Sequence, residues 1–291
     1  MVPPREREII SMHARWAAAL RAGSIAVASL WLAACAPLHY KALGPQDRER
    51  VRQLEVQVVV PQETFVFSAT APGVSAALGG GLIPALIDGA VQKSRQEAMR
   101  GDISATIDRV IDLDYRAEAR EAMVPALAGF PLNVTSHSVT PRIMSKADLD
   151  MRIAATKDGK AFLRLLTHYS LEPKSMTLTT RTHAMLWQDG NPAPSYLGSI
   201  ISQGRALSAA LDGPGALREQ MRQATTDTIR LLALDLNSPQ HAPGQKPKAS
   251  VPILFNGTVI QWAAEQVSAE DGQTVVRDNG GALISVRTKV N

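Results

Sequence analysis

The sequence predicts an α+β fold with a mainly antiparallel sheet, packed helices, and a small C-terminal β-hairpin or meander. Runs rich in β-branched and aromatic residues recur along the chain, which is typical of strands. Two segments, about 102–123 and about 215–236, instead place apolar residues at helical spacing. The apolar fraction is 45% over 291 residues, which is enough for a large core.

The first elements lie between residues 56 and 123. Val56–Phe67 reads as a strand that Pro61 interrupts or ends, because proline cannot donate to a sheet ladder. The glycines 79–81 open a segment, 82–91, with apolar residues at helical spacing. The helix expected at about 102–123 follows it.

The middle of the chain is expected to form most of the sheet. Strand candidates are 132–139, 149–155, 161–171, 176–187 and 196–203. Glu172–Ser175 has turn composition, so the strands on either side of it are predicted to form a hairpin. The long helix at about 215–236 follows, with an apolar stripe along one side.

The C-terminal segment is predicted to be a separate β appendage, 251–291, behind a proline-rich linker at 239–250. Strand candidates 251–262 and 274–290 are joined through Asp271-Gly272, and Asp278–Gly281 is a further hairpin signal. The main α+β domain is accordingly expected at 51–238.

The most specific motif lies near the N-terminus. Residues 24–34 are apolar and uncharged, and Arg15 and Arg21 precede them, which are the proportions of a signal peptide. The run is shorter than the roughly 20 residues that span a bilayer. It ends in Leu32-Ala33-Ala34-Cys35, which resembles the bacterial lipobox.

The motif predicts a signal peptide at 1–34, cleavage between Ala34 and Cys35, and lipid, including palmitate, on Cys35. Residues 35–50 are then expected to form a lipid-anchored tether. Met12 is an alternative start, which would make 1–11 a mis-assigned extension. The alternative to lipidation is an apolar leader with a cysteine at its end by chance.

Other motifs suggest little chemistry. No block of five Lys or Arg occurs, and aromatic residues make up only 4%, so nucleic-acid binding is not expected. Glycines 79–81 favour a flexible turn over a phosphate site. His168 and His183 are interpreted as ordinary half-exposed strand residues. The alternative is that the two histidines face each other across the hairpin and bind a metal ion. No catalytic, cofactor-binding or metal-binding residues are therefore predicted, and the carboxylates are read as a solvated face: Asp108, Asp112 and Asp114.

Four passages resemble a group of uncharacterised proteobacterial lipoproteins. They are Leu32–Cys35, Gly79–Asp88, Leu231–Leu236, and Asn256–Val259 followed by an Asp-Gly turn and Arg277. The resemblance implies an envelope protein with the acylated Cys35 as its only transferable site. Ala36, rather than Asp, after the cysteine implies the outer membrane, on the side facing the periplasm.

Three functions remain open at this point. The first is a non-enzymatic binding, assembly or transport component that is held to the membrane by lipid and contacts another envelope protein. The second is an envelope hydrolase with a dispersed site at His168, His183 and Asp114. The third is lipid or small-ligand binding in an apolar groove between a helix and the sheet.

Overall fold

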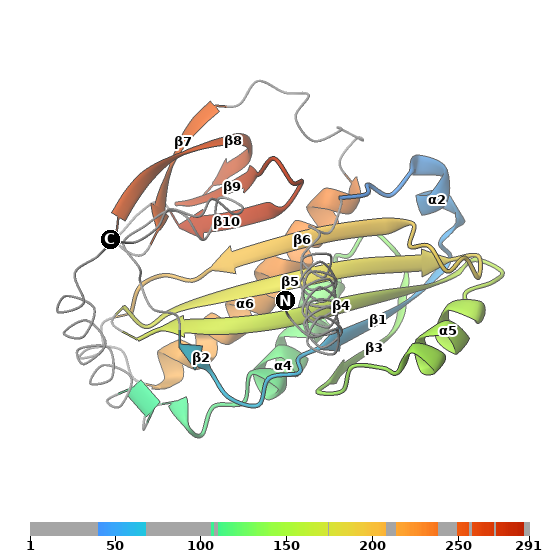
Figure 1. Ribbon diagram of the computed structural model, residues 1–291, viewed down its shortest axis with the longest axis horizontal. Helices are drawn as coiled ribbons and strands as arrows, with labels where there is room; N and C mark the ends of the chain where they lie inside the picture. The colour runs from blue at the N-terminus through green and yellow to red at the C-terminus, as the bar shows by residue number, and fades with distance from the viewer. Residues whose placement is uncertain are drawn as a thin grey trace, which may run out of the picture. The chain divides into compact units, whose positions relative to one another are not determined.

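The fold is α+β, as predicted (Figure 1). The computed structural model describes residues 40–67, 106–107, 110–173, 175–207, 214–237, 249–255, 258–270 and 272–287. The chain divides into two compact units, 1–38 and 39–291, and all described residues belong to the second.

The strands of this unit form one mixed sheet. They are β1 (Gln53–Val59), β2 (Val66–Phe67), β3 (Val134–Thr140), β4 (Lys160–Glu172), β5 (Thr177–Gln188), β6 (Tyr196–Gln203), β7 (Ala249–Phe255), β8 (Thr258–Glu270), β9 (Gln273–Arg277) and β10 (Leu283–Arg287). Their order is β3-β1-β4-β5-β6-β10-β9-β8-β7, and β2 also pairs with β4. Among these described strands, five of the nine pairings are antiparallel.

Pro61 separates β1 from β2, which confirms the predicted interruption. Both strands pair with β4: β1 lies along residues 160–166 of that strand, and β2 lies along 170–171. The predicted β4–β5 hairpin is also confirmed, with paired residues from Ala161 and Gln188 to Glu172 and Thr177.

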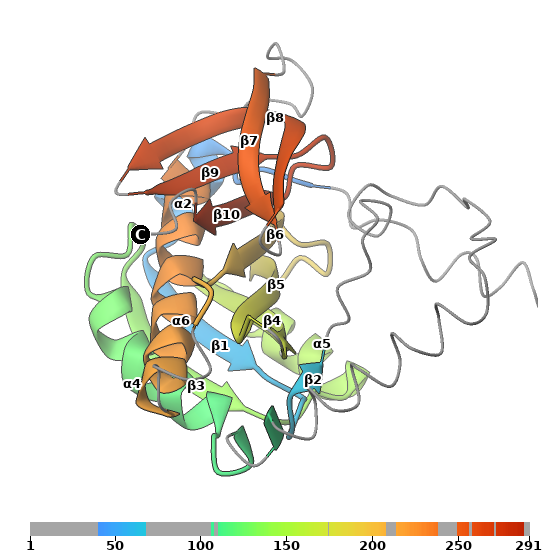
Figure 2. The same cartoon turned by 90° about the vertical axis from the view of Figure 1, so that its left-hand side faces the viewer.

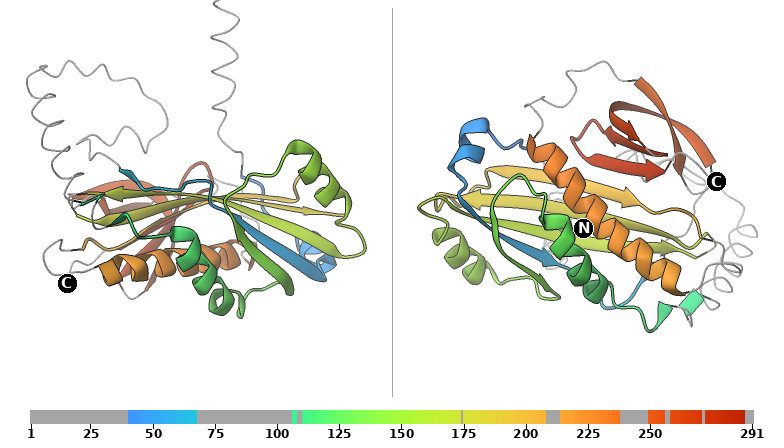
Figure 3. Two further views of the ribbon diagram at one scale, coloured as in Figure 1. Left: turned by 90° about the horizontal axis from the view of Figure 1, so that it is seen from below. Right: turned by 180° about the vertical axis from the view of Figure 1, so that it is seen from behind.

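Two helices cover one face of the sheet. α4 (Tyr115–Leu127) and α6 (Pro214–Asn237) pack against each other, and α6 also contacts β5, β6 and β10. Figures 2 and 3 show both helices on the same side of the strands. The long helix predicted at about 215–236 is therefore confirmed.

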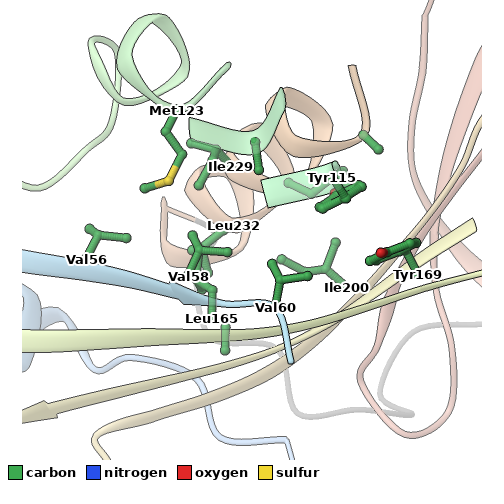
Figure 4. Close-up of a cluster of buried hydrophobic side chains, with 14 of the residues drawn as sticks. Val56, Val58, Val60, Tyr115, Met123, Leu165, Tyr169, Ile200, Ile229 and Leu232 are labelled. Atoms are coloured by element: carbon green, nitrogen blue, oxygen red, sulfur yellow. The ribbon is translucent and has the colours of Figure 1, made fainter. Parts of the chain in front are cut away.

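The space between these helices and the sheet is filled by one packed cluster of side chains. Met123 of α4 and Leu232 of α6 meet Val58 and Leu165 of the central strands (Figure 4). Each fully buried aliphatic side chain contributes about 1.5–3 kcal/mol through the hydrophobic effect. This packing occupies the place where the third hypothesis expected a ligand groove.

The strand predicted at 149–155 is wrong. Residues 149–154 belong to α5 (Lys146–Ala154) and Ala155 is its C-cap; the helix lies on the sheet face opposite α4 and α6 (Figure 3). Ser145 starts the helix because its hydroxyl accepts the Asp148 N–H and donates to the Asp148 carboxylate. Ile153 then packs on Phe162 and Trp187.

The helix predicted at about 102–123 is confirmed only in part: residues 106, 107 and 110 are helical, but a turn at 111–112 interrupts the helix. α4 begins at Tyr115, because the Asp114 side chain accepts the Arg116 N–H and caps the first turn. It continues to Leu127, past Pro125. The helix expected at 82–91 lies outside the described residues.

The folded unit begins before the predicted end of the tether. Lys41 and Leu197 exchange two backbone hydrogen bonds of 2.9 Å, and Leu43 is buried in the main core. α2 (Pro45–Arg50) follows directly. Residues 40–50 therefore pack onto the fold instead of forming tether.

The C-terminal strands are continuous with the main sheet. β10 pairs in parallel with β6, and β7, β8, β9 and β10 are joined by antiparallel pairs. They form the predicted meander, but the β10–β6 pairing joins it to the main domain. β7 starts at Ala249, inside the segment expected to be linker; residues 238–248 lie outside the described part of the chain.

Candidate functional site

A buried polar network surrounds Asp235 on α6. Its carboxylate accepts hydrogen bonds from Tyr196 Oη at 2.7 Å, Tyr40 Oη at 3.1 Å and Arg277 Nη2 at 2.5 Å. Arg277 also donates through Nη1 to the Gly281 carbonyl, and its guanidinium lies 5.1 Å from the centre of the Tyr40 ring. We call this group, Tyr40, Tyr196, Asp235 and Arg277, the Asp235 network.

The network pairs its charges internally. Burial and the neighbouring Asp235 charge raise the pKa of Tyr40 to about 12 and that of Tyr196 well above its ordinary value. Burial by itself lowers the pKa of Arg277, but the charge and hydrogen bond of Asp235 outweigh it, so the pKa rises. Both tyrosines therefore remain neutral donors, and Arg277 remains a cation.

The Asp235 network links four segments that are distant in sequence. Tyr40 precedes α2, and Tyr196 belongs to β6. Asp235 belongs to α6, and Arg277 belongs to β9. The sequence analysis noted Asp235 and Arg277 only within the passages that carry the family resemblance, and it assigned none of these four residues a role. No spacing rule relates a tyrosine to an aspartate 195 residues later, so only the folded chain brings them together.

A second candidate site, separate from the Asp235 network, lies on the sheet face opposite α4 and α6. We define the open face as the outward side chains of β4, β5 and β6: Arg164, Leu166, His168, Arg181, His183, Met185, Leu197 and Ser199. Each is exposed or half-buried, whereas the alternate residues of the same strands are buried against the helices. Of the helices that the structure describes, only α5 packs on this side, at one end of the strands (Figure 3).

Four basic side chains cluster on the open face. His168 lies opposite Arg181 in the β4–β5 register, and His183 lies opposite Leu166, one step along the strands. Arg164 lies one further step along and faces Met185, with its guanidinium 5.2 Å from the centre of the Trp187 ring. We call these four residues the basic cluster. No ion pair links any of them to an acidic residue within the described ranges.

Three polar atoms beneath this surface lack hydrogen-bond partners in the structure. They are Gln57 Oε1, Arg164 Nε and His183 Nδ1. Gln57 is only 7% exposed and is the register partner of Arg164 across β1 and β4. A buried polar atom without a partner costs about 1–3 kcal/mol, so a ligand that accepts from the Arg164 Nε–H or donates to Gln57 Oε1 would be favoured here.

The pKa of His183 is lowered, first by burial and then by the nearby charges of Arg181 and His168. The folded state thus binds the His183 proton less readily than the unfolded chain. We therefore expect this residue's contribution to stability to be fully present above its unfolded pKa of about 6.5 and to be lost progressively as the pH falls from there through the lowered pKa of the folded state.

Chemical denaturation between pH 8 and pH 5 tests this expectation. The wild-type protein should lose stability relative to His183→Gln as the pH falls. His137→Gln, at an exposed position on β3, is the matched control for the loss of a histidine. Parallel pH profiles for wild type and His183→Gln would contradict the expectation.

The predicted site residues have different outcomes. His168 and His183 share one face, as neighbours on the diagonal of the hairpin. Asp114 caps α4, and the adjacent Tyr115 stacks on Tyr169 on the helix side, so Asp114 does not join the two histidines. The dispersed hydrolase site is therefore not assembled.

The other predicted positions give less information. Asp112 is exposed. Cys35, Ala34, Asp108 and glycines 79–81 lie outside the described residues. Within the described ranges, no three His, Cys, Asp or Glu side chains are grouped as metal ligands would be.

Comparison with known proteins assigns no family. No family model matches the chain, and no curated protein matches it. Among the helices that the structure describes, none combines the length and apolarity needed to cross a bilayer.

Proposed function

We propose that the chain is a lipid-anchored protein of the bacterial envelope, acylated on Cys35, whose folded part binds another envelope component. The observation that carries the proposal is the lipobox Leu32–Cys35 behind a leader with a basic start and an apolar middle. This cysteine is the only one in the chain, so it has no intramolecular disulfide partner.

The folded unit would be held close to the membrane. Tyr40, the first described residue, is fixed in the Asp235 network, and it lies five positions after Cys35. Five extended residues reach at most about 18 Å. The outer membrane, on its periplasmic side, is the proposed location, because Ala36 rather than Asp follows the cysteine.

The open face is the surface that we assign to the partner. Its basic cluster lacks acidic partners among the described residues, and buried polar atoms beneath it are unpaired. A partner that supplies acceptors there would pair with the Arg164 Nε–H and with the exposed guanidinium of Arg181. The helix side, by contrast, already buries its apolar residues in the main core.

Replacement of Cys35 by Ser tests the anchor. The wild-type protein should incorporate radiolabelled palmitate and sediment with membranes, whereas Cys35→Ser should do neither, because the hydroxyl does not replace the thiol in this processing. No second cysteine is present to take the label. Palmitate incorporation into Cys35→Ser, or an unmodified thiol behind an intact leader in the native host, would overturn the proposal.

A further inference from the structure

We propose that the open face binds one anionic phospholipid, with the phosphate on the basic cluster and the acyl chains along the neighbouring apolar side chains. This ligand class rests on the proposed function, since it takes the protein to work at a membrane. It goes further by naming the chemistry that the open face recognises.

The basic cluster suits a phosphate group. Neighbouring side chains across a strand pair lie about 5 Å apart, and successive positions on one face lie about 7 Å apart along a strand. Arg164, His183 and His168 are therefore close enough for one headgroup to contact more than one of them. Guanidinium groups donate two parallel hydrogen bonds to phosphate oxygens, which favours an arginine-based site.

Carboxylates that would compete for the cluster are engaged elsewhere. Glu55, on the same sheet face beside Phe162, pairs with Arg152 of α5. Glu172, at the far end of β4, accepts the Ser175 N–H in the hairpin turn. The positive charge of the open face is thus not neutralised by these two neighbours.

The surroundings of the cluster favour an amphiphile over a free anion. Leu166, Met185 and Leu197 are half-buried on the same face, beside the basic cluster. At the border with β10, Ile201 packs against a small cluster with Ile284 and Val286. A phosphate ion would leave these apolar groups in water, whereas an acyl chain would cover them.

An acidic peptide fits this surface less well. Extended peptides commonly bind by adding a strand to an unpaired sheet edge. β4 and β5 lie in the interior of the sheet, where both of their edges are already paired. A peptide would therefore rely on side-chain contacts alone, while a lipid needs no backbone partner.

Native mass spectrometry of the full-length, processed protein in non-ionic detergent tests the proposal. The probes are phosphatidylglycerol, phosphatidylcholine with the same acyl chains, inorganic phosphate and a tetraglutamate peptide. We expect one retained phosphatidylglycerol, bound about tenfold or more tightly than each other probe. Equal binding of phosphatidylcholine, phosphate alone or the peptide would overturn the assigned ligand class.

Two substitutions locate the binding. Arg164→Gln and Arg181→Gln should each weaken phosphatidylglycerol binding about tenfold, because each removes a charged hydrogen-bond donor. Arg181 is exposed, so its variant is expected to fold even where Arg164→Gln does not. Arg120→Gln, at an exposed position of α4 on the other side of the sheet, is the matched control. Unchanged binding in Arg181→Gln, with Arg120→Gln also unchanged, would overturn the proposed site.

Palmitate labelling of the wild-type protein, read beside its phosphatidylglycerol titration, separates the two proposals. If palmitate labelling depends on Cys35 but phosphatidylglycerol does not bind, only the ligand assignment fails. If phosphatidylglycerol binds while Cys35 carries no lipid, the anchor fails and the ligand class survives.

Discussion

Asp235→Ala should lower the free energy of unfolding by about 3–5 kcal/mol, the usual cost of removing one partner from a buried ion pair. Arg277 would remain buried with its charge unpaired, and two tyrosine hydroxyls would lose their shared acceptor. For a domain of this size, the melting temperature should fall by roughly 6–20 °C. Thermal and urea denaturation measure both quantities.

Two further variants show whether the loss of stability in Asp235→Ala comes from the unpaired buried charge or from the shortened side chain. Asp150→Asn removes half of an exposed pair with Lys146 and should change stability by about 1 kcal/mol or less. The double variant Asp235→Leu/Arg277→Met removes both charges and should recover part of the loss, since apolar groups tolerate burial. If Asp235→Ala is as mild as Asp150→Asn, the Asp235 network does not stabilise the fold.

Gly198→Ala should cost about 3–5 kcal/mol, as the sum of overpacking and a lost hydrogen bond. Tyr196 lies along β6 over Gly198 to reach Asp235, and a Cβ at 198 would lie 2.6 Å from Tyr196 Cζ and closer still to its hydroxyl. The tyrosine is fully buried, so it has no open space into which to move. Urea denaturation measures the loss.

A double-mutant cycle of Gly198→Ala with Tyr196→Phe tests whether the contact with Tyr196 causes the loss of stability. Tyr196→Phe removes the atom nearest the new methyl group, so it should cost less in the Gly198→Ala background than in the wild type. Gly215→Ala is the matched control, because nothing lies within 4 Å of its added Cβ and alanine favours helices. Additive effects of the two β6 substitutions would show that Gly198 does not make room for Tyr196.

Local sequence signals predicted several elements correctly. Pro61 predicted the break between β1 and β2, and the turn at Glu172–Ser175 predicted the β4–β5 hairpin. The long apolar stripe predicted α6. These signals succeed because turn chemistry and hydrophobic periodicity act over a few residues.

The errors arose where two local signals competed. Residues 149–155 alternate partly, like a strand, but Ser145 and Asp148 form a helix cap just before them, and the cap determines the structure. Similarly, the apolar spacing at 102–123 suggested one helix, whereas Asp114 starts α4 at Tyr115. In both cases one capping side chain outweighed the pattern.

Short-range chemistry in the chain was sufficient to predict the fold class, the β4–β5 hairpin and the long helix. The lipid attachment at Cys35 also follows from local sequence alone, and it stays a prediction. The Asp235 network and the basic cluster arise only in the folded protein. Their members come from distant segments, and neither a tyrosine 195 residues from its acceptor nor a shared strand face follows from spacing alone. Register and helix packing bring these side chains together, and both depend on the burial of the whole core.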